Sequence, residues 1–324
     1  MSMLSAPLSR RGALLGPAIL PSLDCANVRV THTPRSSGRG RCAANSASMV
    51  CGERRPCGPW MLTTLYVARH AHRMNRSLAG AESAIPRDPP LTARGEEQIH
   101  DLAAFFEGLP PDEKPQLVLS SPYTRCIRTA LPTAERLSLE LCIEPGLAEW
   151  FGPVWPPESG LHPSPRAAEH VVSHFPRVST RWTPLLYPDP RGESIPGVHA
   201  RAQAVMQRID ARCQEWGVER LLIVSHAATI IALGRMLQTQ GSYEDVRDRD
   251  IRAGTASVSK YVRSSPHEVW RQVYNGNTSF LPHGEERAWD FGFVPDNTTE
   301  PGMGPHWHDA YAPRHARLIH RPKL

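Results

Sequence analysis

The sequence predicts an α/β fold of three layers, with a mostly parallel central sheet between two layers of helices. The first observation behind this prediction is an alternation: from Met61 onward, short apolar runs are followed by longer stretches with apolar residues at helical spacing. The second is size, because a chain of 324 residues with ordinary apolar and charged content can bury a full core. Strands that alternate with helices are typical of parallel sheets covered on both faces.

The expected strands are short apolar runs, at residues 62–68, 117–120, 139–143 and 221–224. The expected helices carry an apolar stripe, at residues 92–108, 122–137, 194–216 and 227–237. In the third of these helices the stripe includes Val198, Val205 and Ile209, and Ser194 is a suitable N-cap. Residues 255–263 and 269–274 suit a closing β-hairpin.

Composition divides the chain into a domain at residues 61–281 and two flanking segments. Residues 1–60 are rich in Arg, Ser, Pro and Gly, and we expect a disordered extension. The same composition is that of a mitochondrial transit peptide, and Met61 would also serve as an initiator. The Pro-rich residues 152–191 are too long for a simple connection and are expected to form a lid or insertion over a site. Residues 282–324 are expected to be an irregular tail with solvated histidines.

Charge and cysteine usage indicate an intracellular protein. The net charge of +5 is mild and no Lys/Arg stripe stands out, so no direct contact with nucleic acid is expected. The seven cysteines show neither a CxxC pair nor another zinc spacing, which favours a reducing compartment over a disulfide framework. No apolar run is long enough to span a membrane. We therefore expect the cytoplasm or the nucleus, or the mitochondrion if residues 1–60 are a transit peptide.

Three of the expected strands end in cationic or titratable side chains. Arg69 and His70 follow the first, Arg125 follows the second and His226 follows the fourth. Ligands of open parallel sheets bind at the carboxyl ends of the strands, so these side chains should converge on one crevice. Arginine forks suit phosphate, and a histidine there is either a nucleophile or a further donor.

Two other routes of phosphate chemistry lack their motifs. There is no GxxxxGK[ST] loop and no obvious carboxylate cage for magnesium, so no metal or other cofactor is expected. The phosphoryl group would then pass to a side chain or directly to water, with arginines neutralising its charge.

The ordered motifs of residues 62–281 resemble the histidine phosphatase superfamily, which is also called phosphoglycerate mutase-like. The stretches that carry this resemblance are RHA at 69–71, PLTARGEEQ at 90–98, SSPYTRCIRTA at 120–130, LAEWFG at 147–152, GES at 192–194 and VSHA at 224–227. The resemblance implies a phosphoglycerate mutase-like fold and a phosphatase that works through a phosphohistidine. It departs from the family at Ala71, where the family usually has glycine.

The resemblance also implies a role for each matching residue. His70 would be the nucleophile, and His226 would donate to the phosphoryl oxygens. Three arginines would bind the phosphate: Arg69 and Arg125 as the clamp, and Arg73 as a further pocket arginine. Glu149 would donate a proton to the leaving group, and its apolar neighbours in the sequence would raise the pKa of this carboxyl. By contrast His72 is expected to be an exposed bystander.

Within the superfamily, the amino-acid sequence of several stretches resembles a fungal branch that includes the histidine-phosphatase-like subunit of transcription factor TFIIIC. These stretches are RHAHRMN, SSPYTRCIRTA, EPGLAEWFG and YNGNTSFLPHGEERAWDF. We expect a metal-independent phosphatase that acts on a phosphorylated small molecule or a phosphoprotein. The alternative is a weakly active or inactive docking subunit with protein partners. A phosphoglycerate mutase is disfavoured, because the Pro-rich insertion is not an obvious binding element for a small, highly charged substrate.

Overall fold

The computed structural model describes residues 61–74, 87–154 and 160–293. The predicted extension 1–60 and the distal part of the predicted tail, residues 294–324, lie outside these residues. Seven strands form one sheet in the order β4-β3-β2-β5-β1-β6-β7. Their bounds are β1 Thr64–Arg69, β2 Leu117–Ser120, β3 Leu141–Ile143, β4 Val178–Ser179, β5 Arg220–Ser225, β6 Val258–Val262 and β7 Arg271–Asn277. Strands β4, β3, β2, β5 and β1 run parallel, and the β6–β7 hairpin closes the sheet antiparallel beside β1.

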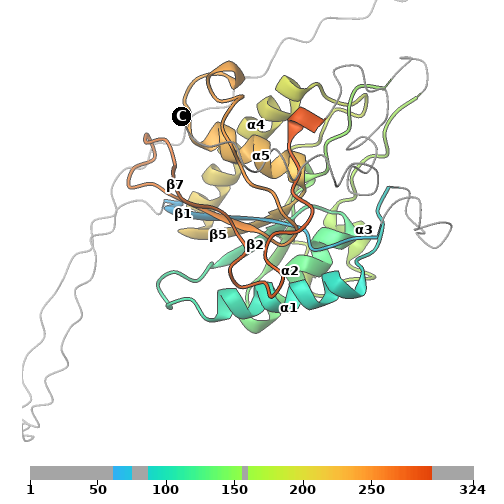
Figure 1. Cartoon of the computed structure of the whole chain (residues 1–324), viewed down its shortest axis with the longest axis vertical. Helices are drawn as coiled ribbons and strands as arrows, with labels where there is room; N and C mark the ends of the chain where they lie inside the picture. Colours follow the sequence, from blue (N-terminus) through green and yellow to red (C-terminus); the bar gives the residue numbers. More distant parts are fainter. Residues whose placement is uncertain (1–60, 75–86, 155–159, 294–324) are drawn as a thin grey trace, which may run out of the picture. The chain divides into compact units, whose positions relative to one another are not determined.

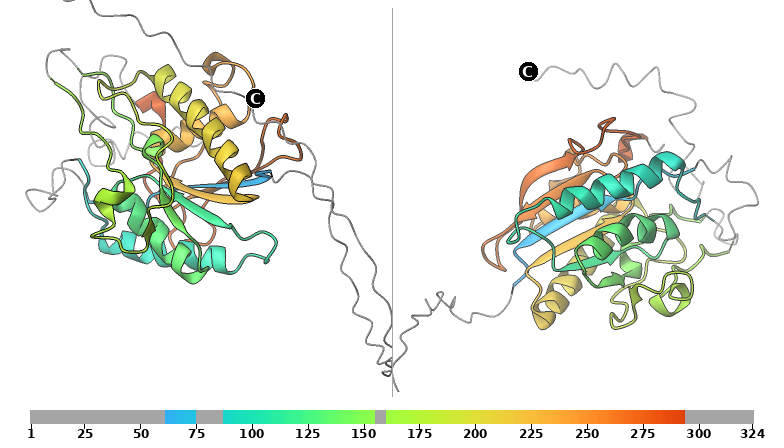
Figure 2. Two further views of the ribbon diagram at one scale, coloured as in Figure 1. Left: turned by 180° about the vertical axis from the view of Figure 1, so that it is seen from behind. Right: turned by 90° about the horizontal axis from the view of Figure 1, so that it is seen from below.

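Two pairs of helices cover the two faces of this sheet (Figure 1). One face carries α1 (Ala93–Glu107) and α2 (Thr124–Arg136), and the other carries α4 (Ile195–Trp216) and α5 (Ala227–Leu237). Figure 2 shows α4 across the sheet from behind, and α1 and α2 side by side from below. Along β5, Leu221 packs into the cluster under α4 and α5, whereas Leu222 packs into the cluster under α1 and α2. The predicted three-layer α/β/α fold with a mostly parallel sheet is confirmed.

Local hydrogen bonds fix where two of the predicted helices begin. The Thr92 hydroxyl accepts from the amide of Gly95 at the start of α1, and the Ser194 hydroxyl accepts from Gly197 at the start of α4. Each satisfies an amide that has no partner inside its helix. Gly217 ends α4 in the left-handed region, at φ 70°, which a glycine adopts without strain.

Part of the Pro-rich segment 152–191 is built into the domain. It contains the short helix α3 (Ala168–Val171) and the edge strand β4, which pairs with β3. Trp182 is fully buried, and its indole N–H donates to the Glu144 carboxylate over 2.9 Å. This half of the segment is therefore part of the domain core, which the irregular, proline-broken sequence does not indicate.

The domain extends beyond the predicted boundary at residue 281. Trp289 and Phe291 are buried in the cluster under α4 and α5, and Phe291 begins the short 3-10 helix η5 (Phe291–Phe293). The sequence does not indicate this extension, because these aromatic residues follow no helical or strand period. We call residues 282–293 the C-terminal strap.

Candidate active site

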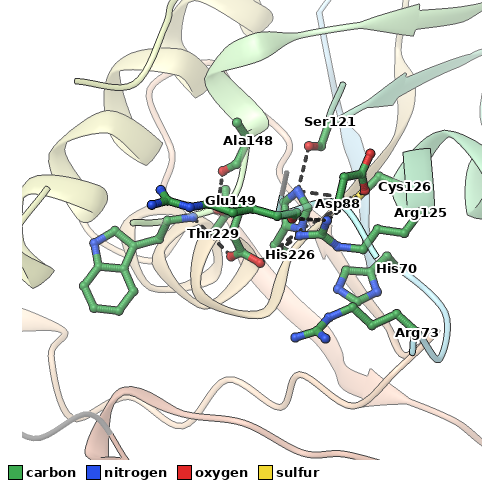
Figure 3. A network of polar contacts seen from close by, with 12 residues as sticks. His70, Arg73, Asp88, Ser121, Arg125, Cys126, Ala148, Glu149, His226 and Thr229 are labelled. Atoms are coloured by element: carbon green, nitrogen blue, oxygen red, sulfur yellow. Dashed lines mark hydrogen bonds and ion pairs between the residues drawn. The ribbon is translucent and has the colours of Figure 1, made fainter. Parts of the chain in front are cut away.

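The carboxyl ends of β1, β5 and β2 lie side by side, because β5 pairs with both other strands. This brings together Arg69, His70, Arg73, Arg125 and His226, which we call the His/Arg cluster (Figure 3 labels all but Arg69). All five side chains are buried. The two imidazole rings lie 5.5 Å apart between centroids. As expected, these cationic and titratable side chains, which are distant in the sequence, lie together at one edge of the sheet.

His70 is held in one tautomer by its own loop. Its Nδ1 lies 2.8 Å from the carbonyl oxygen of Ala71, which can only accept, so Nδ1 carries the proton. Its Nε2 is buried and has no hydrogen-bond partner. Burial, followed by the positive charge of Arg125 and then Arg69, holds the pKa of His70 well below the ordinary value. The ring is therefore neutral at physiological pH and directs a bare lone pair into the cluster.

Ala71 fits its position without strain. Its backbone is not among the described non-glycine residues with positive φ. The backbone N–H donates to the Thr129 hydroxyl over 3.0 Å. Its methyl group belongs to an apolar cluster with Leu91, Ile99 and Leu281. Alanine instead of glycine therefore leaves the geometry of the neighbouring His70 intact.

Arg125 stands between two carboxylates. Its Nη1 lies 3.0 Å from Asp88 and its Nη2 lies 3.1 Å from Glu149, with all three side chains nearly inaccessible to water. Burial alone would lower the pKa of Arg125, but Asp88 and Glu149 outweigh it and raise the pKa. Asp88 also accepts from the amide of Thr124 at the start of α2. Sequence reasoning missed Asp88, because an aspartate before two prolines gives no sign of a partner 37 residues away.

Arg69 and Arg73 face the cluster from β1 and from the loop that follows it. Arg69 Nη1 donates to the carbonyls of Ala253 and Arg287, while its Nε is buried without a partner. Arg73 Nη1 donates to the carbonyl of Met74 over 3.0 Å. Burial lowers the pKa of Arg69 to about 10 and that of Arg73 to about 9, so both remain cations at neutral pH. Arg125 repels each of them, and the Glu149 carboxylate attracts both.

His226 is engaged by protein groups in the described structure. Its Nδ1 lies 2.9 Å from Arg125 Nη2, which can only donate, so the proton is on Nε2 and is given to the Ser121 hydroxyl over 2.7 Å. Burial lowers the pKa of His226 to about 4. The predicted donation to a phosphoryl oxygen would require this side chain to exchange Ser121 or Arg125 for the ligand.

The expected raised pKa of Glu149 is wrong for the described structure. Burial does act to raise it, but His226, then Arg125 and Arg73, lower the pKa of this carboxyl well below its ordinary value. Its Oε2 lies 3.4 Å from His226 Nδ1. The sequence neighbours of Glu149 are apolar, but the fold places cations around its carboxylate, and they decide the outcome.

His72 is not exposed as expected. The side chain is partly buried, and its Nδ1 lies 2.8 Å from the Thr92 hydroxyl at the start of α1. Its backbone N–H donates to the Gln98 side chain over 2.8 Å. His72 therefore fixes the β1–α1 loop on α1 and does not join the cluster.

The C-terminal strap holds both arginines of the β1 end. The Arg287 carbonyl accepts from Arg69, and the Arg287 guanidinium donates to the carbonyl of Arg73 over 2.8 Å. The neighbouring Glu286 accepts from the Gln98 side chain over 2.7 Å. No motif in this segment indicates such contacts, because they join residues about two hundred positions apart.

Among the described residues, no group of three or more His, Cys, Asp or Glu side chains could hold a metal ion. None of the helices in residues 61–74, 87–154 and 160–293 has both the length and the apolar content that a membrane span needs. A cavity of about 430 Å³ lies between α4, α5 and residues 263–270, and no residue of the His/Arg cluster lines it.

The three-layer fold and the His/Arg cluster at the carboxyl ends of its strands agree with a comparison to protein families. The family profile of the histidine phosphatase superfamily (branch 1) matches residues 65–275. The chain belongs to this superfamily.

The chain is similar in sequence to two individual proteins. The chain is 31% identical over 265 residues to the transcription factor tau 55 kDa subunit of Saccharomyces cerevisiae, covering 72% of this chain and 60% of the yeast protein. The resemblance to the branch with a TFIIIC subunit is thereby confirmed. The chain is also 26% identical over 174 residues to phosphoserine phosphatase 1 of Hydrogenobacter thermophilus, covering 53% of this chain and 74% of that protein.

A solved structure agrees with the fold. The ecdysone phosphate phosphatase of Bombix mori in complex with tungstate superposes with a TM-score of 0.50 at 15% identity, covering 76% of this chain and 99% of that one. This likeness concerns the fold alone.

Proposed function

We propose that the chain is a metal-independent phosphatase that hydrolyses a phosphomonoester through a phosphohistidine on His70. One observation carries the proposal: His70 Nε2 is buried, unprotonated and unpartnered among three arginines. An unpartnered buried nitrogen is costly unless the ligand-bound state uses it. A nucleophile needs a free lone pair, and the Nδ1–H bond to Ala71 keeps that lone pair on Nε2.

In the first step, His70 Nε2 attacks phosphorus, and the bond from phosphorus to the ester oxygen breaks. The electron pair goes to the leaving oxygen, which takes a proton from Glu149. In the second step, water attacks the phosphohistidine, gives its proton to Glu149 and restores the neutral imidazole. Arg69, Arg73 and Arg125 neutralise the phosphoryl oxygens throughout, which is the role a metal ion has in other phosphatases.

Glu149 can hold a proton only when phosphate is present. In the ligand-free site at neutral pH, where His226 is uncharged, Arg125 and Arg73 keep it ionised. A phosphate dianion would satisfy the arginines and place negative charge beside the carboxylate, and both effects raise its pKa. Substrate binding would thus itself favour the protonated form of Glu149, the proton donor.

The test measures release of inorganic phosphate from p-nitrophenyl phosphate in the presence of EDTA. Wild-type protein should turn over, and His70→Ala should lose activity by at least about a thousandfold. His100→Ala is the matched control, because this histidine is exposed on α1 and lies outside the cluster, and it should retain activity. Rapid denaturation during turnover should trap an acid-labile phosphate on the wild type alone. Full activity in His70→Ala would disprove the proposal.

A second candidate function rests on the similarity to the yeast tau 55 kDa subunit. On this reading the fold serves as a docking subunit of a nuclear transcription factor complex, with or without residual activity. Affinity purification of the endogenous protein from nuclear extract should then recover stoichiometric partner subunits. A monomer without partners at physiological salt would count against the docking role and leave the phosphatase proposal untouched.

A further inference from the structure

Glu149, the proposed proton donor, lies in irregular backbone just after the short 3-10 helix η2 (Pro145–Leu147). It belongs to no helix or strand that would fix the direction of its side chain. A general acid works only when its carboxyl lies within hydrogen-bond reach of the leaving oxygen. The contacts that hold residues 146–152 in place therefore bear directly on catalysis.

The backbone before Glu149 is held by side chains of both helices on the α4/α5 face of the sheet. Arg201 Nη1 on α4 donates to the Gly146 carbonyl over 2.7 Å and to the Ala148 carbonyl over 3.0 Å. The Thr229 hydroxyl on α5 donates to the same Ala148 carbonyl over 2.8 Å (Figure 3). These donors fix the peptide unit that leads into Glu149.

Glu193 orients Arg201 and also holds the backbone after Glu149. Both oxygens of its carboxylate accept from Arg201 Nε, over 2.8 and 2.9 Å, and the two side chains are almost fully buried. The Glu193 carbonyl accepts from the Trp150 indole over 2.7 Å, and its N–H donates to the Phe151 carbonyl over 2.8 Å. The segment is thus held on both sides of the proton donor.

The GES stretch at residues 192–194 builds this arrangement. Gly192 has a φ of 86°, and a Cβ atom there would lie 2.1 Å from the Gly152 carbonyl oxygen, so only glycine lets the two backbone segments approach this closely. Glu193 supplies the contacts just described. Ser194 caps α4, the helix from which the guanidinium comes. Each residue of the motif therefore supports the loop that carries the proton donor.

We propose that Arg201, which Glu193 orients, is a positioning residue that aims the carboxyl of Glu149 at the leaving oxygen. Among the described residues, the hydrogen bonds of Arg201 go to Glu193 and to two carbonyls, so it acts through the backbone of residues 146–149. A displacement of about 1 Å at a reacting group is enough to cost roughly a hundredfold in rate. This inference rests on the proposed function.

The first experiment measures how the rate depends on the leaving group. Arg201→Met keeps a long unbranched side chain but removes every hydrogen bond of the guanidinium. Nitrophenolate leaves readily without a proton, whereas phenolate depends on the general acid. The variant should therefore lose at least about thirtyfold in kcat/KM for phenyl phosphate and less than about threefold for p-nitrophenyl phosphate. A merely destabilised enzyme would lose the same factor for both esters.

Arg263→Met is the matched control. Arg263 is also an arginine with a buried side chain; it pairs with Asp210 and donates to the Leu62 carbonyl over 2.9 Å. It lies just after β6, beside the amino end of β1 and therefore at the opposite end of the sheet from Glu149. This variant should lose stability as well, but the ratio of kcat/KM between the two esters should stay at the wild-type value.

Thr229→Val tests the same backbone contact with little risk to folding. It removes one of the two donors to the Ala148 carbonyl and should shift the ratio between the esters severalfold in the same direction as Arg201→Met. Thr133→Val is its control, because Thr133 is a buried threonine on α2 whose hydroxyl has no hydrogen-bond partner. This control should leave the ratio unchanged.

A binding experiment gives a readout that needs no turnover. Bound phosphate raises the pKa of a carboxyl beside it, so the site should take up protons when inorganic phosphate binds. Calorimetry at about pH 8, in two buffers that differ in ionisation enthalpy, counts these protons, and the part that Glu149→Gln removes is the share of Glu149. Arg201→Met should reduce this share at least about twofold, and Arg263→Met should not change it.

The two experiments separate the inference from the proposed function. If the wild type hydrolyses neither ester but its proton uptake falls in Arg201→Met, the proposed function fails and the positioning of Glu149 at the phosphate stands. If the wild type hydrolyses both esters and Arg201→Met changes neither the ratio nor the uptake, the positioning role is overturned and the proposed function stands. An equal loss for the two esters in both Arg201→Met and Thr229→Val would also overturn it.

Discussion

Acidification should destabilise the folded chain strongly, because three histidines are buried in the neutral form. Burial lowers the pKa of His199 and of His226 to about 4, and that of His70 well below its ordinary value. An unfolded histidine titrates near pH 6.5. Between these pH values the unfolded state binds protons that the folded state does not bind. The contribution of the neutral histidines to the free energy of unfolding is therefore complete above about pH 6.5 and is lost as the pH falls toward about 4.

The size of the effect follows from the shift. For a folded pKa of about 4, lowering the pH from 7.5 to 5.0 costs about 2 kcal/mol of unfolding free energy per histidine, and about 4 kcal/mol for His199 and His226 together. His70 adds to this loss in the same direction. The loss is a large part of the stability of many domains. Urea unfolding followed by circular dichroism at the two pH values measures it directly.

Variants test whether the histidines of the His/Arg cluster cause this drop in the free energy of unfolding between pH 7.5 and 5.0. His70→Asn keeps a donor for the Ala71 carbonyl but removes the titration, so the drop should become smaller. His267→Asn, at an exposed side chain, is the control and should leave the drop unchanged. Saturating inorganic phosphate should also reduce the drop, because its negative charge favours protonated imidazoles. Equal unfolding free energies at pH 7.5 and 5.0 would refute the neutral, desolvated state of these rings.

Three further predictions concern groups around His70. Ala71→Gly should lower the unfolding free energy by about 1 kcal/mol without raising kcat, because the methyl group packs in an apolar cluster; a faster enzyme would contradict this. Asp88→Asn removes one of the two carboxylates of Arg125 and should cost about 3 kcal/mol. Phosphate should then raise the melting temperature of this variant more than that of the wild type, and an equal increase would count against the charge argument. Arg287→Ala should raise the inhibition constant of phosphate severalfold with little change in kcat, because Arg73 loses a support; an unchanged constant would show that the strap does not position it.

The order of the elements could be predicted from the sequence, because each depends on local signals. Helix α5 has the predicted bounds, and α4 begins directly after the predicted cap Ser194. Helix α1 begins one residue after the predicted start at Thr92. Strand β4 could not be predicted, because two residues, Val178–Ser179, carry no period and pair only because β3 offers a free edge.

The fold class, the family and the identity of the residues at three strand ends can be read from the sequence, because strand ends follow from apolar periodicity and parallel sheets align them. The charge states and contacts of those residues depend on the tertiary structure. Glu149 is ionised although its sequence neighbours are apolar, since a pKa depends on charges through space. Asp88 and the C-terminal strap support the arginines from distant parts of the chain, and such contacts leave no mark in a local pattern.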